Sequence, residues 1–187
     1  MIYIYVVSAK DSPAEPRLQK EYDSALAREV LFSALLKDFS LPEAEILRTE
    51  CGKPYFEAEG YPAFSISHSG GLIAVAITRD GGRVGIDVES ADRLCNTRLS
   101  DRFFSGLRLT GEGGPEIRTS LPEGASLAPA ADTPTSRFTL GEAIIKCDGR
   151  GFAVAGEAVT LSEKMKKKSF IIKTAEGEWS LSIAVCD

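Results

Sequence analysis

The sequence contains a single histidine, and its four cysteines show none of the paired spacings that zinc sites and redox motifs use. No stretch approaches the roughly 18 uninterrupted apolar residues of a membrane helix, and residues 1–7 lack the basic flank of a signal peptide. Positive charge is not in excess either, because the 187 residues carry a formal net charge of -5. A net negative charge gives the chain no overall electrostatic attraction to nucleic acid or to an anionic membrane. We therefore expect a cytoplasmic protein that binds neither, with reduced cysteines.

Hydrophobic residues make up 43% of the chain, which is enough for one full core or two small ones. The spacing of apolar residues predicts helices at 21–39, 92–103 and 138–147, the last closed by Asp148 and Gly149. Strands are predicted at 1–7, 46–49, 64–67, 72–78, 84–89, 158–161, 169–174 and 179–185. Because helices and strands are grouped rather than strictly alternating, we expect an α+β fold and not a doubly wound sheet.

Two stretches do not follow these patterns. Residues 106–137 are dominated by Gly, Pro, Ser, Thr, Ala and Glu without apolar periodicity, so we expect a mobile loop there. The basic run at 164–168 is expected to be a solvated turn.

The segment 84–89 is the most informative part of the sequence. Side chains alternate along a strand, so Asp87 and Glu89 share one face while Ile86 and Val88 face the core. Two carboxylates on one face repel each other unless a cation lies between them, and a hard oxygen cluster suits Mg²⁺. Taken alone, the pattern fits an exposed edge strand with acidic residues facing water even better.

Four further charged or polar residues are candidates for chemistry. Glu142 and Lys146 are four residues apart on one helix face, which is also the spacing of an ordinary surface ion pair. His68 lies where an apolar strand runs into a glycine-rich turn, either as a ligand for a phosphate or as a cap on the strand end. Lys53, in a rigid Gly-Lys-Pro turn, either contacts a phosphate or stays solvated.

Taken in order, four blocks of the sequence resemble the signature of the Sfp-type 4′-phosphopantetheinyl transferases, in the holo-acyl-carrier-protein synthase superfamily. The blocks are Gly52-Lys53-Pro54-Tyr55-Phe56, Phe64 to Gly70, Val84 to Glu89, and Glu142 to Gly151. They cover about half of the chain, and their shared order makes an accidental match far less probable than for any single block.

The resemblance implies a fold and an activity. The family fold is a pseudo-two-fold pair of small α+β halves with the active site between them, here residues 1–83 and 84–187, and two halves in one chain favour a monomer. The implied activity moves the 4′-phosphopantetheine arm of coenzyme A to a serine of an apo acyl or peptidyl carrier protein, in fatty acid, polyketide or nonribosomal peptide synthesis, and releases 3′,5′-ADP.

The resemblance also implies roles for individual residues. Asp87, Glu89 and Glu142 would hold Mg²⁺ against the pyrophosphate of coenzyme A, and Lys146 would neutralise charge on the same group. Lys53, Ser67 and His68 would hold the 3′-phosphate of the adenosine. Glu142, directly or through a water molecule, would take the proton from the carrier serine.

The sequence departs from the family pattern at several positions. Ser65 stands where the family usually has Asn, Phe138 where it has Trp, and Gly141 where it has Lys. The block Asp101 to Ser105 is similar to a family motif, but the low-complexity stretch replaces the acidic residue and helix that should follow it. These differences leave open a coenzyme A-binding protein with lost or weak transferase activity, and a Mg²⁺-dependent phosphohydrolase is a further alternative.

Overall fold

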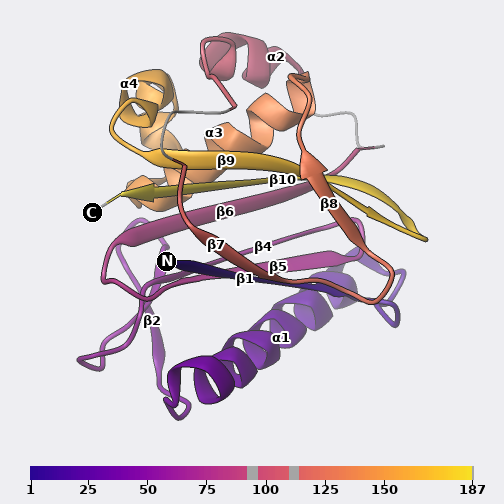
Figure 1. Ribbon diagram of the computed structural model, residues 1–187, viewed down its shortest axis with the longest axis vertical. Helices are drawn as coiled ribbons and strands as arrows, with labels where there is room; N and C mark the ends of the chain where they lie inside the picture. The colour runs from indigo at the N-terminus through magenta and orange to yellow at the C-terminus, as the bar shows by residue number, and fades with distance from the viewer. Residues whose placement is uncertain (92–96, 110–113, 187) are drawn as a thin grey trace.

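The computed structural model describes residues 1–91, 97–109 and 114–186 of the chain. Two four-stranded sheets lie face to face, with helix α1 (Pro16–Ala34) outside one sheet and helix α3 (Pro134–Asp148) outside the other (Figure 1). These four layers make a mixed α+β fold, as the grouping of the elements predicted. Among the helices of the three described segments, none combines the length and apolar character that crossing a membrane requires.

The first sheet has the strand order β4-β5-β1-β7. Its strands are β1 (Ile2–Ser8), β4 (Phe64–Ser69), β5 (Leu72–Thr78) and β7 (Ile117–Ser120). Helix α1 begins with Pro16, whose fixed φ suits the first helical turn, and continues into a π-helical turn η1 (Leu35–Phe39). Its apolar stripe packs on the outer face of β5, and a small hairpin of β2 (Ile46–Arg48) and β3 (Pro54–Phe56) lies beside it.

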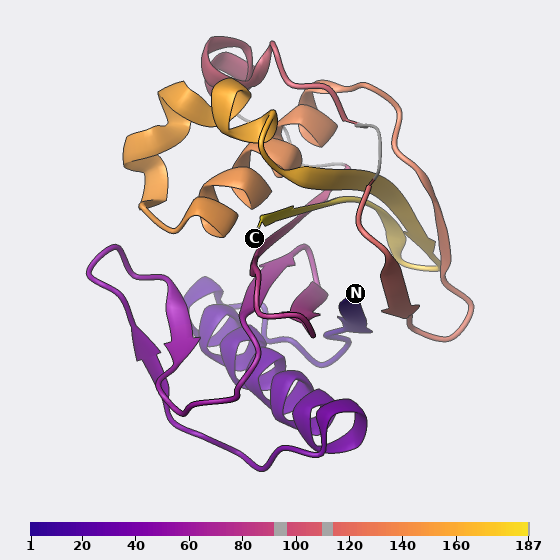
Figure 2. The same cartoon turned by 60° about the vertical axis from the view of Figure 1, so that its left-hand side comes forward.

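The second sheet has the strand order β6-β10-β9-β8. Its strands are β6 (Arg83–Ser90), β8 (Ser126–Pro129), β9 (Lys166–Thr174) and β10 (Gly177–Cys186). Helix α3 covers this sheet together with shorter helical pieces (Figure 2), namely α2 (Thr97–Leu99), η2 (Ser100–Phe104), η3 (Gly151–Glu157) and α4 (Ala158–Ser162).

Three expectations about local structure need correction. The segment 106–137 contains β7, β8 and the first turn of α3, because edge strands are held by backbone hydrogen bonds and need no apolar alternation. The strand expected at 158–161 is wrong, since these residues form α4 and bury Ala158 with α3. The basic run enters β9, where Lys167 is buried and its Nζ donates to the Ser162 carbonyl at 2.8 Å. The helix expected at 92–103 begins outside the described residues.

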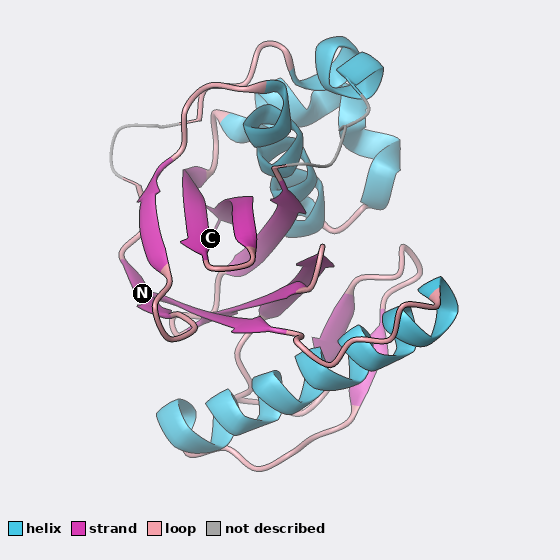
Figure 3. Ribbon diagram, turned by 90° about the vertical axis from the view of Figure 1, so that its right-hand side faces the viewer, coloured by secondary structure: helices cyan, strands magenta, loops and turns pink. Residues whose placement is uncertain are grey.

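The main core lies between the two sheets, and a row of serines joins their edges. The two sheets lie against each other (Figure 3). Apolar side chains of β1 and β5 meet those of β6, β9 and β10 in one cluster. At the adjoining edges, hydroxyls of β4 accept hydrogen bonds from backbone amides of β6. The distance from the amide nitrogen to the serine Oγ is 3.1 Å for Ile86 and Ser65, 3.3 Å for Val88 and Ser67, and 3.4 Å for Ser90 and Ser69. This serine ladder fixes the register of β4 against β6, and with it the place of the acidic residues of β6.

Candidate functional site

The acidic residues of β6 are buried, although β6 is an edge strand of its sheet. Asp87 is 5% exposed and Glu89 is 9% exposed, whereas Ile86 and Val88 lie in the core between the sheets. The predicted alternation is therefore confirmed. The alternative of carboxylates facing water is excluded for both residues. Burying a carboxylate is costly unless it is paired or hydrogen-bonded, so each needs partners nearby.

Helix α3 supplies those partners because its backbone touches β6 directly. A Cβ atom at Gly85 would lie 2.0 Å from the Ala143 carbonyl oxygen and 2.4 Å from the Cys147 nitrogen. Only glycine allows so close an approach. The helix begins with a Thr133 hydroxyl that accepts from the Ser136 amide, and it ends at Gly149 in the left-handed conformation.

The departure from the family pattern at position 141 also has a structural cause. A Cβ atom at Gly141 would lie 2.5 Å from the ring of Phe104. Phe104 is fully buried and makes an edge contact with Phe138, with ring centroids 6.1 Å apart. In this protein the space beside the helix at position 141 is therefore filled by an aromatic ring from η2.

Lys146 is the residue that joins α3 to the acidic strand. Its Nζ donates to Asp87 Oδ1 at 2.7 Å, to Ser67 Oγ at 3.1 Å and to the Ile86 carbonyl at 3.2 Å. The ladder serines complete the shell, since Ser67 Oγ donates to Asp87 Oδ1 at 2.8 Å and Ser69 Oγ to Glu89 Oε2 at 2.6 Å. The acidic pair, Lys146 and Ser67 thus form one buried polar cluster.

The third acid, Glu142, titrates under the influence of this cluster. Burial, with a smaller contribution from the nearby charges of Asp87 and Glu89, raises the pKa of Glu142 to about 7 against the opposing effect of Lys146. Burial also raises the pKa of Asp87, with Lys146 and Ser67 opposing it. A carboxyl with a pKa near 7 is suited to accept a proton at neutral pH. The structure therefore brings Glu142 within electrostatic reach of Asp87 and Glu89.

The residues fit a hard divalent cation in their chemistry, but they are not arranged as a finished metal centre. Within residues 1–91, 97–109 and 114–186, no three His, Cys, Asp or Glu side chains are grouped to hold a metal ion. One buried oxygen, Asp87 Oδ2, has no hydrogen-bond partner among the residues that the structure describes. Carboxylate oxygens are the ligands that Mg²⁺ prefers, so a cation beside Asp87 would satisfy this atom.

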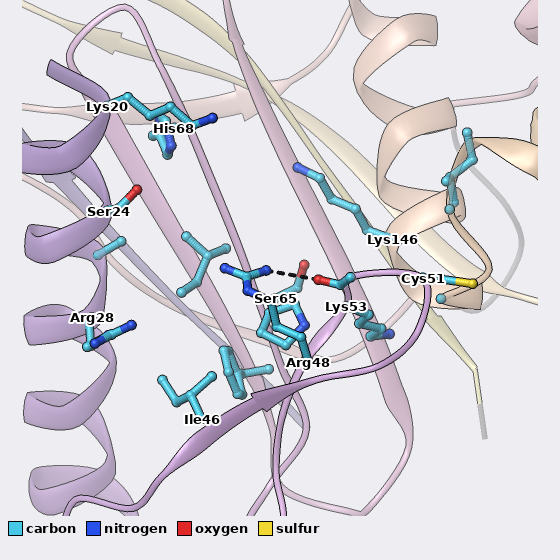
Figure 4. Close-up of a pocket in the computed structure, with 18 residues that line it drawn as sticks. Lys20, Ser24, Arg28, Ile46, Arg48, Cys51, Lys53, Ser65, His68 and Lys146 are labelled. Atoms are coloured by element: carbon cyan, nitrogen blue, oxygen red, sulfur yellow. Dashed lines mark hydrogen bonds between the residues drawn. The ribbon is translucent and has the colours of Figure 1, made fainter. Parts of the chain in front are cut away.

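A pocket of about 620 Å³ opens next to the carboxylate cluster and is lined by cations. Its walls come from α1, the β2–β3 hairpin, β4 and the end of α3 (Figure 4). Among the described residues, its lining includes the basic side chains of Lys20, Arg28, Arg48, Lys53, His68 and Lys146, and none of the carboxylates described lines it. Because the whole chain carries a net charge of -5, this pocket is a local excess of positive charge that suits an anionic ligand.

The structure separates Ser67 from His68, which the resemblance grouped at one phosphate. Neighbouring residues of β4 point to opposite faces, so His68 lines the pocket while Ser67 contacts Asp87 and Lys146. Lys53 lines the pocket as well, but its Nζ donates to the Cys147 carbonyl at 2.9 Å and to the Val84 carbonyl at 3.4 Å. Burial lowers the pKa of Lys53.

Sequence reasoning missed three basic residues of the pocket, and a buried acid that contacts His68. Lys20 and Arg28 are eight residues apart on the face of α1 that lines it, and Arg48 donates to the Gly52 carbonyl at 2.9 Å. Asp23, buried in α1, accepts from Ser12 Oγ at 3.0 Å, and its Oδ2 lies 3.5 Å from His68 Nδ1. The spacing of Lys20 and Arg28 was readable in the sequence, but the predicted helix began only at residue 21 and so left Lys20 outside it. The contact of Asp23 depends on the tertiary fold.

Comparison with known proteins adds a partial match. No protein-family model matches the chain. It is 36% identical over 97 residues to the 4′-phosphopantetheinyl transferase AcpT of Escherichia coli O157:H7, and equally to AcpT of Escherichia coli strain K12. The match covers 50% of this chain and 49% of each relative, so the chain spans about half the length of the curated relatives it matches. This similarity supports the relationship to phosphopantetheinyl transferases that the four sequence blocks indicate.

Proposed function

We propose that the protein is a Mg²⁺-dependent 4′-phosphopantetheinyl transferase of the Sfp type. It would use coenzyme A to modify a serine of an apo acyl or peptidyl carrier protein and release 3′,5′-ADP. The observation that carries the proposal is the position of Lys146, which lines the cationic pocket and also contacts Asp87 at 2.7 Å. A ligand with phosphates in this pocket would therefore reach the buried carboxylates. The similarity to AcpT points to the same activity.

Coenzyme A matches the charge of the pocket, because it carries a 3′-phosphate and a pyrophosphate on one adenosine. We assign the 3′-phosphate to His68 and Lys53, with Lys20 and Arg28 of α1 as additional cations of the pocket. Ser67 lies with Lys146 instead, so we move it from the 3′-phosphate to the pyrophosphate end of the ligand. Charge-assisted contacts of this kind are the usual means of holding phosphates.

In the proposed reaction the serine oxygen of the carrier attacks the β-phosphorus of coenzyme A, and the bond to the departing 3′,5′-ADP breaks. Glu142 accepts the serine proton, directly or through a water molecule, and its pKa of about 7 suits this role at neutral pH. Lys146 stabilises negative charge on the pyrophosphate. Asp87, Glu89 and Glu142 would hold Mg²⁺, which supplies electrostatic stabilisation of the transferring and departing phosphates when bound.

The proposed function implies an overall arrangement for the chain. The halves 1–83 and 84–187 would form the pseudo-two-fold pair of the family, with the site in the cleft between them. The protein would act as a cytoplasmic monomer. Its pocket draws residues from both halves, since α1 and β4 precede residue 84 and α3 follows it.

The test is incubation with coenzyme A, Mg²⁺ and a panel of apo carrier proteins, followed by mass spectrometry of the carriers. We expect a carrier to gain the mass of the phosphopantetheine arm at one serine, and chelation of Mg²⁺ with EDTA to stop the reaction. Consumption of coenzyme A without any carrier would instead indicate a phosphohydrolase. An unmodified panel would reject the transferase.

A coenzyme A-binding protein without transferase activity is the second candidate. It is favoured by Gly141, where the Phe104 ring fills the space beside the helix and a lysine of the family is missing. Binding of coenzyme A measured by calorimetry, combined with no modification of any carrier, would select this candidate.

A further inference from the structure

We propose that Lys146 takes the place of the divalent cation at Asp87 while the pocket is empty, and that phosphates entering the pocket draw it away. This inference rests on the proposed function. It assigns an order to the site, in which coenzyme A binds first and the metal ion follows. It also explains why Asp87, Glu89 and Glu142, whose oxygens suit a hard cation, do not form a metal-binding group in the described residues.

The first support is the set of atoms around the Lys146 ammonium. The nitrogen contacts a carboxylate oxygen, a hydroxyl oxygen and a backbone carbonyl oxygen, at 2.7, 3.1 and 3.2 Å. These are all oxygen ligands of the kind that a hard cation takes. The ammonium therefore neutralises Asp87, whose carboxylate is almost wholly buried and would otherwise be costly.

The second support is electrostatic. Mg²⁺ binds oxygen ligands at about 2.0 to 2.1 Å, so an ion on the Asp87 carboxylate would lie within a few ångströms of an ammonium on the same group. Two cations that close, in a site with little solvent, repel each other strongly. While the lysine contacts Oδ1, no group in the described part of the chain forms a hydrogen bond with Asp87 Oδ2. The lysine and the metal ion therefore compete for Asp87.

The third support is that Lys146 has a place to go. Its side chain is 31% exposed, it lines the cationic pocket, and a lysine has a flexible four-carbon stem. The exposed cations Lys20, Arg28 and Arg48 share this pocket, which would gather a ligand rich in phosphate. A pyrophosphate at this end of the pocket offers the ammonium new anionic oxygens, so the lysine can leave Asp87 without losing its counter-charge.

Because binding free energies are linked, the same coupling acts in both directions. Coenzyme A strengthens metal binding by some factor, and the metal must strengthen coenzyme A binding by the same factor. Removing the ammonium should raise the metal affinity of the free protein and remove most of this coupling.

The experiment is direct titration of Mn²⁺, as a spectroscopic probe for Mg²⁺, followed by electron paramagnetic resonance of the free ion. In the wild-type protein we expect at least about tenfold tighter Mn²⁺ binding with coenzyme A than without it, a typical coupling between linked sites. Lys146→Met should bind Mn²⁺ at least about tenfold more tightly than wild type when coenzyme A is absent. The exposed Lys164 lies far along the sequence from the cluster, so Lys164→Met is the matched control for loss of one charge and should bind as wild type does.

Two results would overturn the inference. Equal Mn²⁺ affinity of the wild type with and without coenzyme A, when calorimetry shows that coenzyme A is bound, would show that no exchange occurs, and this measurement needs no variant. A folded Lys146→Met protein that binds Mn²⁺ no better than wild type would show that the lysine does not hold the cation site. If coenzyme A fails to bind at all while Lys146→Met still gains Mn²⁺ affinity, the proposed function fails and the role of Lys146 at Asp87 is upheld.

Discussion

The two ends of the candidate site are built in different ways. At the pocket end the cations Lys20, Arg28 and Arg48 are exposed side chains of a helix and a hairpin, free to meet a ligand. At the carboxylate end, Asp87 and Glu89 are buried between β6 and α3, and ladder serines and Lys146 hold them. Charge at the first end contributes little to folding, whereas charge at the second end is part of the core. Substitutions in the pocket should therefore change ligand binding without changing the free energy of unfolding. Substitutions at the carboxylates should change both.

The largest effect is expected at Asp87. Asp87→Ala removes a buried carboxylate of the proposed metal site and the partner of Lys146, so we expect transfer to a carrier to fall at least about 100-fold, as for loss of a principal electrostatic group. The measurement is carrier modification followed by mass spectrometry, with circular dichroism to show that the variant is folded.

An exposed acid provides the control for this substitution. Glu178 is exposed and pairs with Lys173 at the start of β10, so Glu178→Ala should retain the wild-type rate. Near wild-type transfer by a folded Asp87→Ala protein would mean that the chemistry lies elsewhere.

The next effect concerns the contact that holds the carboxylate end together. Gly85→Ala places a methyl group 2.0 Å from the Ala143 carbonyl, and backbone atoms cannot move aside as a side chain can. We expect the free energy of unfolding to fall by about 2 to 3 kcal/mol, in the range of overpacked cores. Urea denaturation measures this loss.

Gly156→Ala is the matched control, because nothing lies within 4 Å of the added Cβ atom and Gly156 does not have a positive φ. Equal stability of the two variants would contradict the direct contact between α3 and β6.

Much of the carboxylate end was predictable from local pattern. Strand alternation placed Ile86 and Val88 in the core and the two acids opposite them, and the structure confirms this. The end of α3 at Gly149 was also predicted from the residue type. Alternation could not predict that the two acids are buried. The sequence of an edge strand with acidic residues suggests exposure to solvent, and only the tertiary fold shows that a helix covers the strand.

The pocket end was less predictable because its residues meet only in three dimensions. Lys20, Arg48 and His68 come from three elements that no local pattern connects. The grouping of Ser67 with His68 ignored the alternation that had been applied to β6, although the same period of two acts in β4. Segment 117–120 was taken for loop because its pairing with β1 depends on backbone hydrogen bonds and leaves no signal in side-chain chemistry.

A smaller effect is expected at the pocket end. Arg28→Gln should weaken coenzyme A binding about threefold to tenfold without loss of stability, since it removes one exposed cation near the phosphates and surface charges contribute little to folding. Calorimetry at two salt concentrations measures the affinity, and the difference from wild type should shrink at high salt.

Lys37→Gln removes an equal charge from an exposed position of η1 outside the pocket and should leave binding unchanged. If both variants weaken binding alike, the effect reflects overall charge and not the pocket.

The smallest effect is expected at the carboxylate end, where the thermal stability of the protein should depend on pH through Glu142. The pKa of Glu142 is raised from its ordinary value of 4.5 to about 7, mainly by burial. The folded protein therefore keeps a proton that the unfolded chain has released, so wild-type stability declines as pH rises from about 4.5 to about 7 and then levels off. Glu142→Gln cannot titrate, so its stability should not show this decline.

In EDTA-containing buffer at pH 8 we expect the Tm of Glu142→Gln to exceed that of wild type by about 2 to 4 °C, equivalent to about 1 kcal/mol. The two Tm values should converge near pH 4.5, and Glu178→Gln, at an exposed position, should follow wild type throughout. A constant difference between Glu142→Gln and wild type across this range would mean that Glu142 is not perturbed in the folded protein.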